Sequence, residues 1–160
     1  MMDLTVAQAA GLSELAIREK IDIMEQALNA MQAEGVPGLD LPVKHTFTDG
    51  VYVREIAIPA DSLIIGKIHL HSHLNYITKG KVTVLTRDGL QDLEGPCTIY
   101  SSAGTKRALY THTDTIWTTV HANPTNETAL DKLEDMTITK DYTPFPLLEG
   151  ELQNLIGELL

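Results

Sequence analysis

The chain has 160 residues, of which twelve are basic and twenty-two acidic, so its formal charge at neutral pH is −10. This excess of negative charge disfavours nucleic acid and anionic membranes as partners, although a local basic pocket remains compatible with a small anion. The sequence shows no secretory signal and no apolar run near the roughly 18 residues of a membrane span, and its single cysteine, Cys97, cannot close an internal disulfide. We therefore expect one cytoplasmic domain.

The first segment, residues 1–38, is expected to be helical. Thr5 and Gln8 match a capping box for a short helix that ends near Ala10, and a longer helix is predicted from Glu14 to Glu34, where Gly35 ends it. One face of the longer helix carries apolar residues at alternating steps of four and three: Ile17, Ile21, Met24, Leu28 and Met31. This apolar face packs on the chain's own domain or joins two or three copies of it, and we expect a homo-oligomer.

Residues 39–140 have the texture of a mainly β domain. Short β-rich runs are separated by turn residues such as Asp49-Gly50 and Asp88-Gly89, and the apolar period changes from 3.6 to 2. Eight or more strands without helices between them predict a jelly roll or a related closed barrel. The predicted strands are Val43–Phe47, Val51–Ile58, Leu63–His73, Asn75–Thr78, Lys81–Thr86, Leu90–Leu93, Thr98–Ser101, Lys106–Tyr110, Thr115–His121 and Met136–Thr139.

The stretch from Gly66 to Gly80 holds three histidines, His69, His71 and His73, at a spacing of two. In one extended strand their side chains would all project from the same face of a sheet. This stretch is therefore the first candidate for a site.

With this strand inside a run of short strands, the sequence resembles the cupin superfamily, small β-barrels whose first motif runs Gly, five residues, His-x-His, three or four residues, Glu, six residues, Gly. Gly80 matches the closing glycine. The resemblance then places His73 at the Glu position, His69 at the second His and Lys67 at the first, while His71 is additional.

The second cupin motif is similar to the run from Ser102 to Arg107. Gly104 keeps its place, but Arg107 stands where the family has a metal-binding histidine. A guanidinium stays protonated and cannot donate to a metal, so the family's usual site is incomplete here. From about Leu41 to Glu134 the sequence also resembles small cupin-like proteins of bacteriophages and prophages, which implies residence in a host cytoplasm or in a virion.

A hairpin between Arg107–Tyr110 and Thr115–His121 would place Arg107 opposite Thr119 on the face that a cupin turns inward. Three interpretations of this interior stay open. Three of its histidines could hold a divalent metal (Zn, Fe, Mn or Ni), the histidines could form a metal-free hydrogen-bonded cluster, or Arg107 and Lys67 could bind a carboxylate or phosphate. The predicted metal ligands are His69, His71, His73 and His121, and the predicted ligand contacts are Lys67, Arg107, Trp117 and Thr119.

Residues 141–160 read as a linker followed by a C-terminal amphipathic helix. Prolines restrict the linker, and the apolar face of the helix should dock on the barrel or on the N-terminal helix. That face comprises Leu148, Leu152, Leu155 and Leu159.

Two functions remain in competition. The first is a cupin-like barrel that binds a small molecule, with or without a metal; the second is a non-catalytic phage structural or host-interaction protein that uses the barrel as a scaffold. Cys97 has no paired base and Ser101 and Ser102 lack a nucleophile elbow, so no pattern assigns nucleophilic catalysis. Whether the protein is an enzyme is left undecided by these residues.

Overall fold

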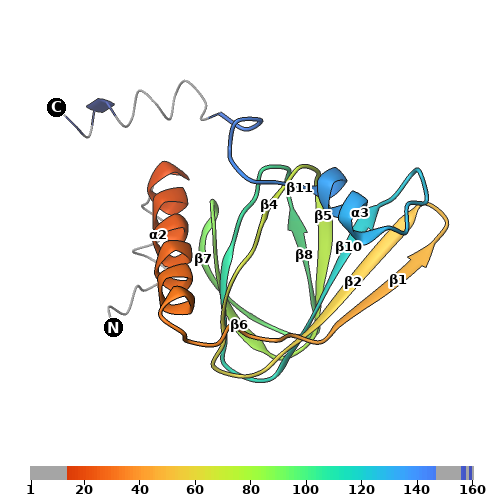
Figure 1. Cartoon of the computed structure of the whole chain (residues 1–160), viewed down its shortest axis with the longest axis horizontal. Coiled ribbons are helices and arrows are strands. Elements are labelled where there is room, and N and C mark those ends of the chain that lie inside the picture. Colours follow the sequence, from red (N-terminus) through yellow and green to blue (C-terminus); the bar gives the residue numbers. More distant parts are fainter. Residues whose placement is uncertain (1–13, 147–155, 158, 160) are drawn as a thin grey trace.

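The computed structural model describes residues 14–146, 156, 157 and 159. Helix α2 (Glu14–Ala33) lies outside the barrel, along one wall (Figure 1). It ends in a Schellman motif, in which Gly35 takes a φ of 95° and Val36 N donates to Met31 O at 3.0 Å. The predicted longer helix is confirmed, whereas the short helix predicted from Thr5 to Ala10 lies outside the described residues.

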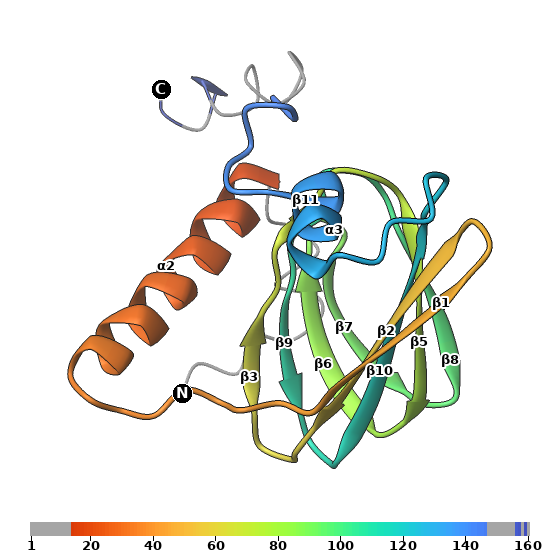
Figure 2. The same cartoon turned by 45° about the vertical axis from the view of Figure 1, so that its right-hand side comes forward.

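The strands form two facing antiparallel sheets that enclose the barrel (Figures 1 and 2). One sheet has the order β1-β2-β10-β5-β8 and the other the order β3-β9-β6-β7, while β11 pairs with β4. The strands are β1 (Val43–Thr48), β2 (Val51–Ile58), β3 (Leu63–Ile65), β4 (Ile68–His69), β5 (His73–Lys79), β6 (Lys81–Thr86), β7 (Gly89–Glu94), β8 (Cys97–Ser101), β9 (Ala108–Thr111), β10 (Thr115–Ala122) and β11 (Ile138–Thr139).

Two apolar clusters hold this arrangement together. The cluster inside the barrel joins the sheets through Ile58, Ile77, Val82, Val84, Leu109 and Trp117. The second cluster lies on the outside, where Ile17 and Ile21 of α2 pack against Leu85 and Ala108. The first half of the predicted apolar face of α2 therefore packs on the chain's own barrel, while Met31 farther along is 47% exposed.

The long strand predicted from Leu63 to His73 is wrong, because the chain breaks it into β3 and β4. At Gly66 the backbone passes close to Arg107: Gly66 N donates to Arg107 O at 2.8 Å, and a Cβ on Gly66 would lie 3.4 Å from that oxygen. A glycine permits this approach. After β4 the chain bends again, so His71 lies outside any strand.

The predicted hairpin between residues 107–110 and 115–121 is also wrong. Strand β9 pairs with β3 and β6, whereas β10 pairs with β2 and β5 in the other sheet. The turn at residues 112–114 therefore carries the chain from one sheet to the other. Alternation along β10 is nevertheless as predicted, since Trp117, Thr119 and His121 are all buried.

A helix stands where none was predicted. Helix α3 (Leu130–Thr137) precedes β11 and includes Met136, which was predicted to begin a strand. Leu130 and Leu133 are three residues apart, the spacing of neighbours on a helix face, and Leu133 is buried. Together α3 and β11 lie across one end of the barrel, where Ile138 pairs with His69 (Figure 2).

The segment after β11 runs back to α2. The Arg18 guanidinium lies 3.9 Å from the centre of the Tyr142 ring and donates to Phe145 O at 3.0 Å. The predicted C-terminal helix falls mostly outside the described residues. The three residues of it that are described, 156, 157 and 159, are helical. Within the described part of the chain, no helix has the length and apolar character needed to cross a membrane.

Candidate ligand site inside the barrel

The barrel encloses a cavity of about 470 Å³ that is lined by both sheets and by α3. Its only lining carboxylate among the described residues is Glu134, against the cationic side chains of Arg54, Lys67 and Arg107. The described lining of the cavity is thus locally basic, although the protein as a whole is acidic. Its apolar wall comprises Leu41, Ile56, Ile58, Ile64, Ile65, Leu109 and Trp117.

Strand registers give the cavity an apolar end and a polar end. Along β10 the inward residues pair in turn with β2: Trp117 with Ile56, Thr119 with Arg54, and His121 with Tyr52. The lining therefore changes from apolar to cationic to imidazole and phenol along one strand. The covering α3 and β11 lie at the polar end, since Ile138 pairs with His69.

Three of the four predicted metal-binding histidines meet at this polar end. The ring centres of His69 and His73 lie 4.2 Å apart, those of His73 and His121 5.2 Å, and those of His69 and His121 5.6 Å. His71 does not join them, because its side chain is exposed in the bend before β5. Its backbone still contributes: His71 O lies 3.0 Å from Nδ1 of His73.

The clustered imidazoles are neutral at physiological pH. Burial, followed by the charges of His73, Arg107 and His121, lowers the pKa of His69 to about 3. Burial, followed by the charge of His73, lowers the pKa of His121 to about 4, and burial also lowers the pKa of His73. Neutral imidazoles can bind a metal or take part in hydrogen bonds, but they supply no charge to attract an anion.

The imidazole nitrogens of the cluster are donors of a kind that binds metal ions, but their arrangement does not fit a metal ion. Nδ1 of His69 and Nε2 of His73 are buried and have no hydrogen-bond partner in the described part of the chain. Among those same residues, however, no three His, Cys, Asp or Glu side chains are grouped so that they could hold a metal ion. The Arg107 charge, which lowers the pKa of both imidazoles, also opposes a cation.

Arg107 is the charged centre of the cavity. Its side chain is 7% exposed, its Nη1 donates to Asn75 Oδ1 at 3.3 Å, and its Nη2 donates to Ser101 Oγ. Among the described residues no carboxylate lies within ion-pair distance of it. Burial lowers the pKa of Arg107 to about 10, which still leaves the guanidinium charged at neutral pH.

Asn75 was absent from the predicted site and is central to it. Its side chain is fully buried, and its Oδ1 accepts hydrogen bonds from Trp117 Nε1 at 3.1 Å and Thr119 Oγ1 at 3.0 Å as well as from Arg107. Arg107 and Thr119 therefore meet through Asn75, not as the cross-strand pair that the sequence predicted. Period-two alternation from His73 would have placed Asn75 on the inner face.

The structure also adds residues at the rim of the polar end. The Tyr52 hydroxyl lies 2.7 Å from Nδ1 of His45, and the Tyr52 ring stacks on His121 with 5.9 Å between ring centres. Arg54 follows on the same face of β2 and lines the cavity. Lys67 lines the cavity too, but its side chain is exposed, so its charge is hydrated.

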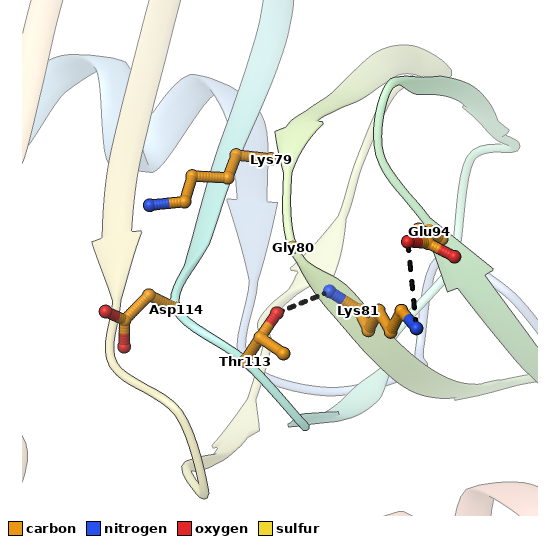
Figure 3. Close-up of a pocket in the computed structure, with 6 residues that line it drawn as sticks. All are labelled: Lys79, Gly80, Lys81, Glu94, Thr113 and Asp114. Carbon is orange, nitrogen blue, oxygen red and sulfur yellow. Dashed lines mark hydrogen bonds and ion pairs between the residues drawn. The ribbon is translucent and has the colours of Figure 1, made fainter.

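A second hollow lies on the surface where β5 ends and β6 begins (Figure 3). Its volume is about 360 Å³, and Lys79 and Asp114 lie on one side of it. Several of its polar groups already have partners: Lys81 N donates to Thr113 Oγ1 at 2.9 Å, Lys81 Nζ lies 3.8 Å from Glu94 Oε1, and Asp114 Oδ1 accepts from Ala60 N at 3.0 Å. We therefore place the candidate site in the barrel and not in this hollow.

No protein-family model matches the chain, and no curated protein matches it in sequence. Its structure is similar to that of salicylate 1,2-dioxygenase from Pseudaminobacter salicylatoxidans, with 13% identity and a TM-score of 0.52 over 76% of this chain and 37% of that one. The Cnp3 cupin domain of Schizosaccharomyces pombe is also similar in structure, with 13% identity and a TM-score of 0.47 over 65% of this chain and 78% of that one. So is an RmlC-like cupin of Shewanella frigidimarina, with 15% identity and a TM-score of 0.47 over 54% of this chain and 79% of that one.

At such low identity these similarities concern the fold and not the activity. The phage origin and the homo-oligomer expected from the sequence stay predictions. The described sheets, their antiparallel pairing and the similarity to the salicylate 1,2-dioxygenase structure agree with the predicted fold class. The chain has a mainly β, cupin-type jelly-roll fold.

Proposed function

We propose that the barrel binds a small organic anion whose charged group pairs with Arg107. The single observation that supports this function is a buried guanidinium that faces the cavity while its hydrogen-bond partners, Asn75 and Ser101, are both neutral. A buried charge is costly unless it is paired, so a carboxylate or similar group gains a strong, charge-assisted contact there.

The rest of the cavity favours a ligand with a compact apolar body. Ile56, Ile58 and Trp117 lie beyond Arg107 at the apolar end, where they remove apolar surface from water. The neutral imidazoles at the other end can exchange hydrogen bonds with a polar substituent but attract no second negative charge. An apolar monocarboxylate matches this lining better than inorganic phosphate does.

The only tryptophan of the chain, Trp117, makes this proposal easy to test. Its indole lines the cavity, so ligand binding should change its fluorescence. We expect benzoate or hexanoate to bind and their neutral amides to bind more weakly. Replacing Arg107 with Met should weaken binding of the acids by about a hundredfold, since a desolvated charge pair is lost. Lys81→Met, which removes an exposed cation from the surface hollow, is the matched control and should leave binding unchanged.

Binding of the acids by Arg107→Met with undiminished affinity would contradict the proposal. So would a wild-type protein that binds none of the acids at millimolar concentration. That second result would favour the scaffold function, in which the barrel is a rigid block for assembly.

A divalent metal in the imidazole cluster is the second candidate, and one observation favours it. Because the His71 carbonyl can only accept, Nδ1 of His73 carries the proton and Nε2 presents a buried lone pair that has no partner among the described residues. In such a site the protein's part would be to fix the His73 tautomer through the His71 carbonyl.

Elemental analysis of protein purified without chelators tests this second candidate. Stoichiometric Zn, Fe, Mn or Ni that is lost in His73→Ala but kept in His112→Ala, a variant at an exposed histidine outside the cluster, would support it. Equal metal content in the two variants would refute it.

A further inference from the structure

The hydrogen-bond partners of Arg107 carry an inference that rests on the proposed function and makes it more specific. We infer that Asn75 sets the charge selectivity of the cavity: its neutral amide holds the guanidinium in place without neutralising it, so the charge is kept for a single anionic group of the ligand. Asn75 is in this sense a positioning residue, because it acts on the ligand through Arg107.

The orientation of the Asn75 amide follows from its neighbours. An indole N–H and a guanidinium can only donate, so the side-chain atom that faces Trp117 and Arg107 has to be the oxygen. The amide nitrogen then points the other way and donates to Ser101 Oγ at 2.9 Å. Ser101 Oγ also accepts from Arg107, so Asn75 and Ser101 together hold both terminal nitrogens of the guanidinium.

An aspartate at this position would satisfy almost the same contacts. It has the shape of asparagine, and its carboxylate would accept the bonds from Arg107, Trp117 and Thr119. Only the bond to Ser101 would change, since the hydroxyl would have to donate where it now accepts. It would also form a buried ion pair with Arg107, and the cavity would then have no charge left for a ligand. The choice of an amide is therefore what separates an anion-binding cavity from a neutralised one.

The surroundings limit the ligand to one buried negative group. Lys67 is exposed and Arg54 only partly buried, so water already solvates both charges. A second anionic group at the polar end would therefore be desolvated without a counter-charge, which selects a monoanion over a dianion.

Asn75→Asp tests the inference with Trp117 fluorescence. The probes are benzoate and hexanoate, each matched by its uncharged amide. We expect the variant to bind the acids at least about tenfold more weakly than the wild-type protein, because the new carboxylate competes for Arg107. Its affinity for the amides should stay unchanged, which a merely structural disturbance of the cavity would not allow.

Asn123→Asp is the matched control. Asn123 is also buried, its amide bonds the backbone of Glu127, and it lies outside the cavity lining. The substitution buries the same new charge and should leave the affinity for the acids unchanged. If Asn75→Asp does not fold, Ser101→Asp places a carboxylate beside the other terminal nitrogen of Arg107 and should weaken acid binding in the same way.

The outcomes separate the inference from the proposed function. If Asn75→Asp binds the acids as tightly as the wild-type protein while Arg107→Met does not, the inference is overturned and the proposed function stands. An equal loss of affinity for acids and amides also overturns it, because Asn75 would then act on shape and not on charge. If the wild-type protein binds neither acid, the proposed function fails and the inference falls with it.

Discussion

Lys106 and Arg107 are neighbours in the sequence and are almost equally buried, at 9% and 7% exposure, but they serve opposite sides of the barrel wall. Lys106 points outward to α2, where its Nζ bonds Asp22 at 3.1 Å and Glu25 at 2.5 Å. Arg107 lines the cavity, and its hydrogen-bond partners within the described part of the chain are all neutral. The outer charge is matched by the fold, whereas the inner one is not.

This difference between Lys106 and Arg107 indicates which of the two buried charges contributes to the stability of the fold. Two carboxylates on one helix neutralise Lys106, so its desolvation is offset as soon as α2 docks. No comparable group among the described residues offsets the desolvation of Arg107, and its retention inside the barrel calls for a reason outside folding. The outer region should therefore control stability and the inner region ligand binding.

The largest expected effect on stability lies in the outer region. Ile21 is 1% exposed at the contact between α2 and the barrel, so Ile21→Ala should lower the free energy of unfolding by about 2 to 4 kcal/mol. Denaturant titration measures this. Ile23→Ala on the same helix, at a side chain that is 63% exposed, is the control and should change it by less than about 0.5 kcal/mol. Equal losses in the two variants would contradict the described docking of α2.

Exchanging the two cations for methionine compares the regions directly. Lys106→Met leaves Asp22 and Glu25 without their partner, but these carboxylates are partly exposed, so we expect a loss of about 1 to 2 kcal/mol. Arg107→Met should cost less than about 1 kcal/mol, because Asn75 keeps its bonds from Trp117 and Thr119 and a buried charge disappears. Thermal unfolding of both variants measures the contrast. A larger loss for Arg107→Met would make Arg107 a structural residue.

The inner and outer regions should also lose their contributions to folding stability at opposite ends of the pH scale. His69 and His121 have pKa values of about 3 and 4 in the folded state, below the ordinary 6.5, so the unfolded chain binds more protons in that interval. Stability from these residues is therefore present above pH 6.5 and lost as the pH falls to about 4 for His121 and about 3 for His69. In chelator-treated protein, His69→Gln should flatten this acid limb; an unchanged limb would contradict the neutral cluster.

Lys106 gives the opposite sign. Desolvation lowers its pKa, but hydrogen bonds and charges from Glu25 and Asp22 outweigh this and raise the pKa above its ordinary 10.5. Its contribution to stability is therefore present below pH 10.5 and lost as the pH rises through the raised pKa. Lys106→Met should remove this alkaline limb and leave the acid limb intact.

The smallest expected effect belongs to Lys67, at the rim of the cavity. Because its side chain is exposed, Lys67→Ala should weaken binding of benzoate only about twofold, and the difference should vanish in roughly 1 M salt. A tenfold loss that persists in high salt would instead make Lys67 a direct ligand contact, as the sequence predicted.

Strand alternation made part of the site predictable. Along β10 the period of two correctly places Trp117, Thr119 and His121 on one buried face, because a paired strand leaves no freedom in the direction of its side chains. The same rule failed for His71, because the strand does not continue through it. Contacts of Gly66 and His69 with residues 104–107 bend the chain there, and local sequence does not reveal contacts between segments so far apart.

Asn75 shows a second limit of the sequence. Its position on the inner face follows from alternation, but its role depends on three donors from β10 and from the segment before β9, which only the fold brings together. Likewise α3 was missed because eight residues with only one buried side chain give a weak apolar pattern.

A crystal structure of the protein soaked with 4-bromobenzoate tests the central claim most directly. We predict that the anomalous signal of bromine lies inside the barrel near Ile56 and Trp117, with the carboxylate bonded to Arg107. A barrel without the acid, in which the Arg107 guanidinium is paired with a carboxylate of the protein itself, would contradict the claim that this charge is kept for a ligand.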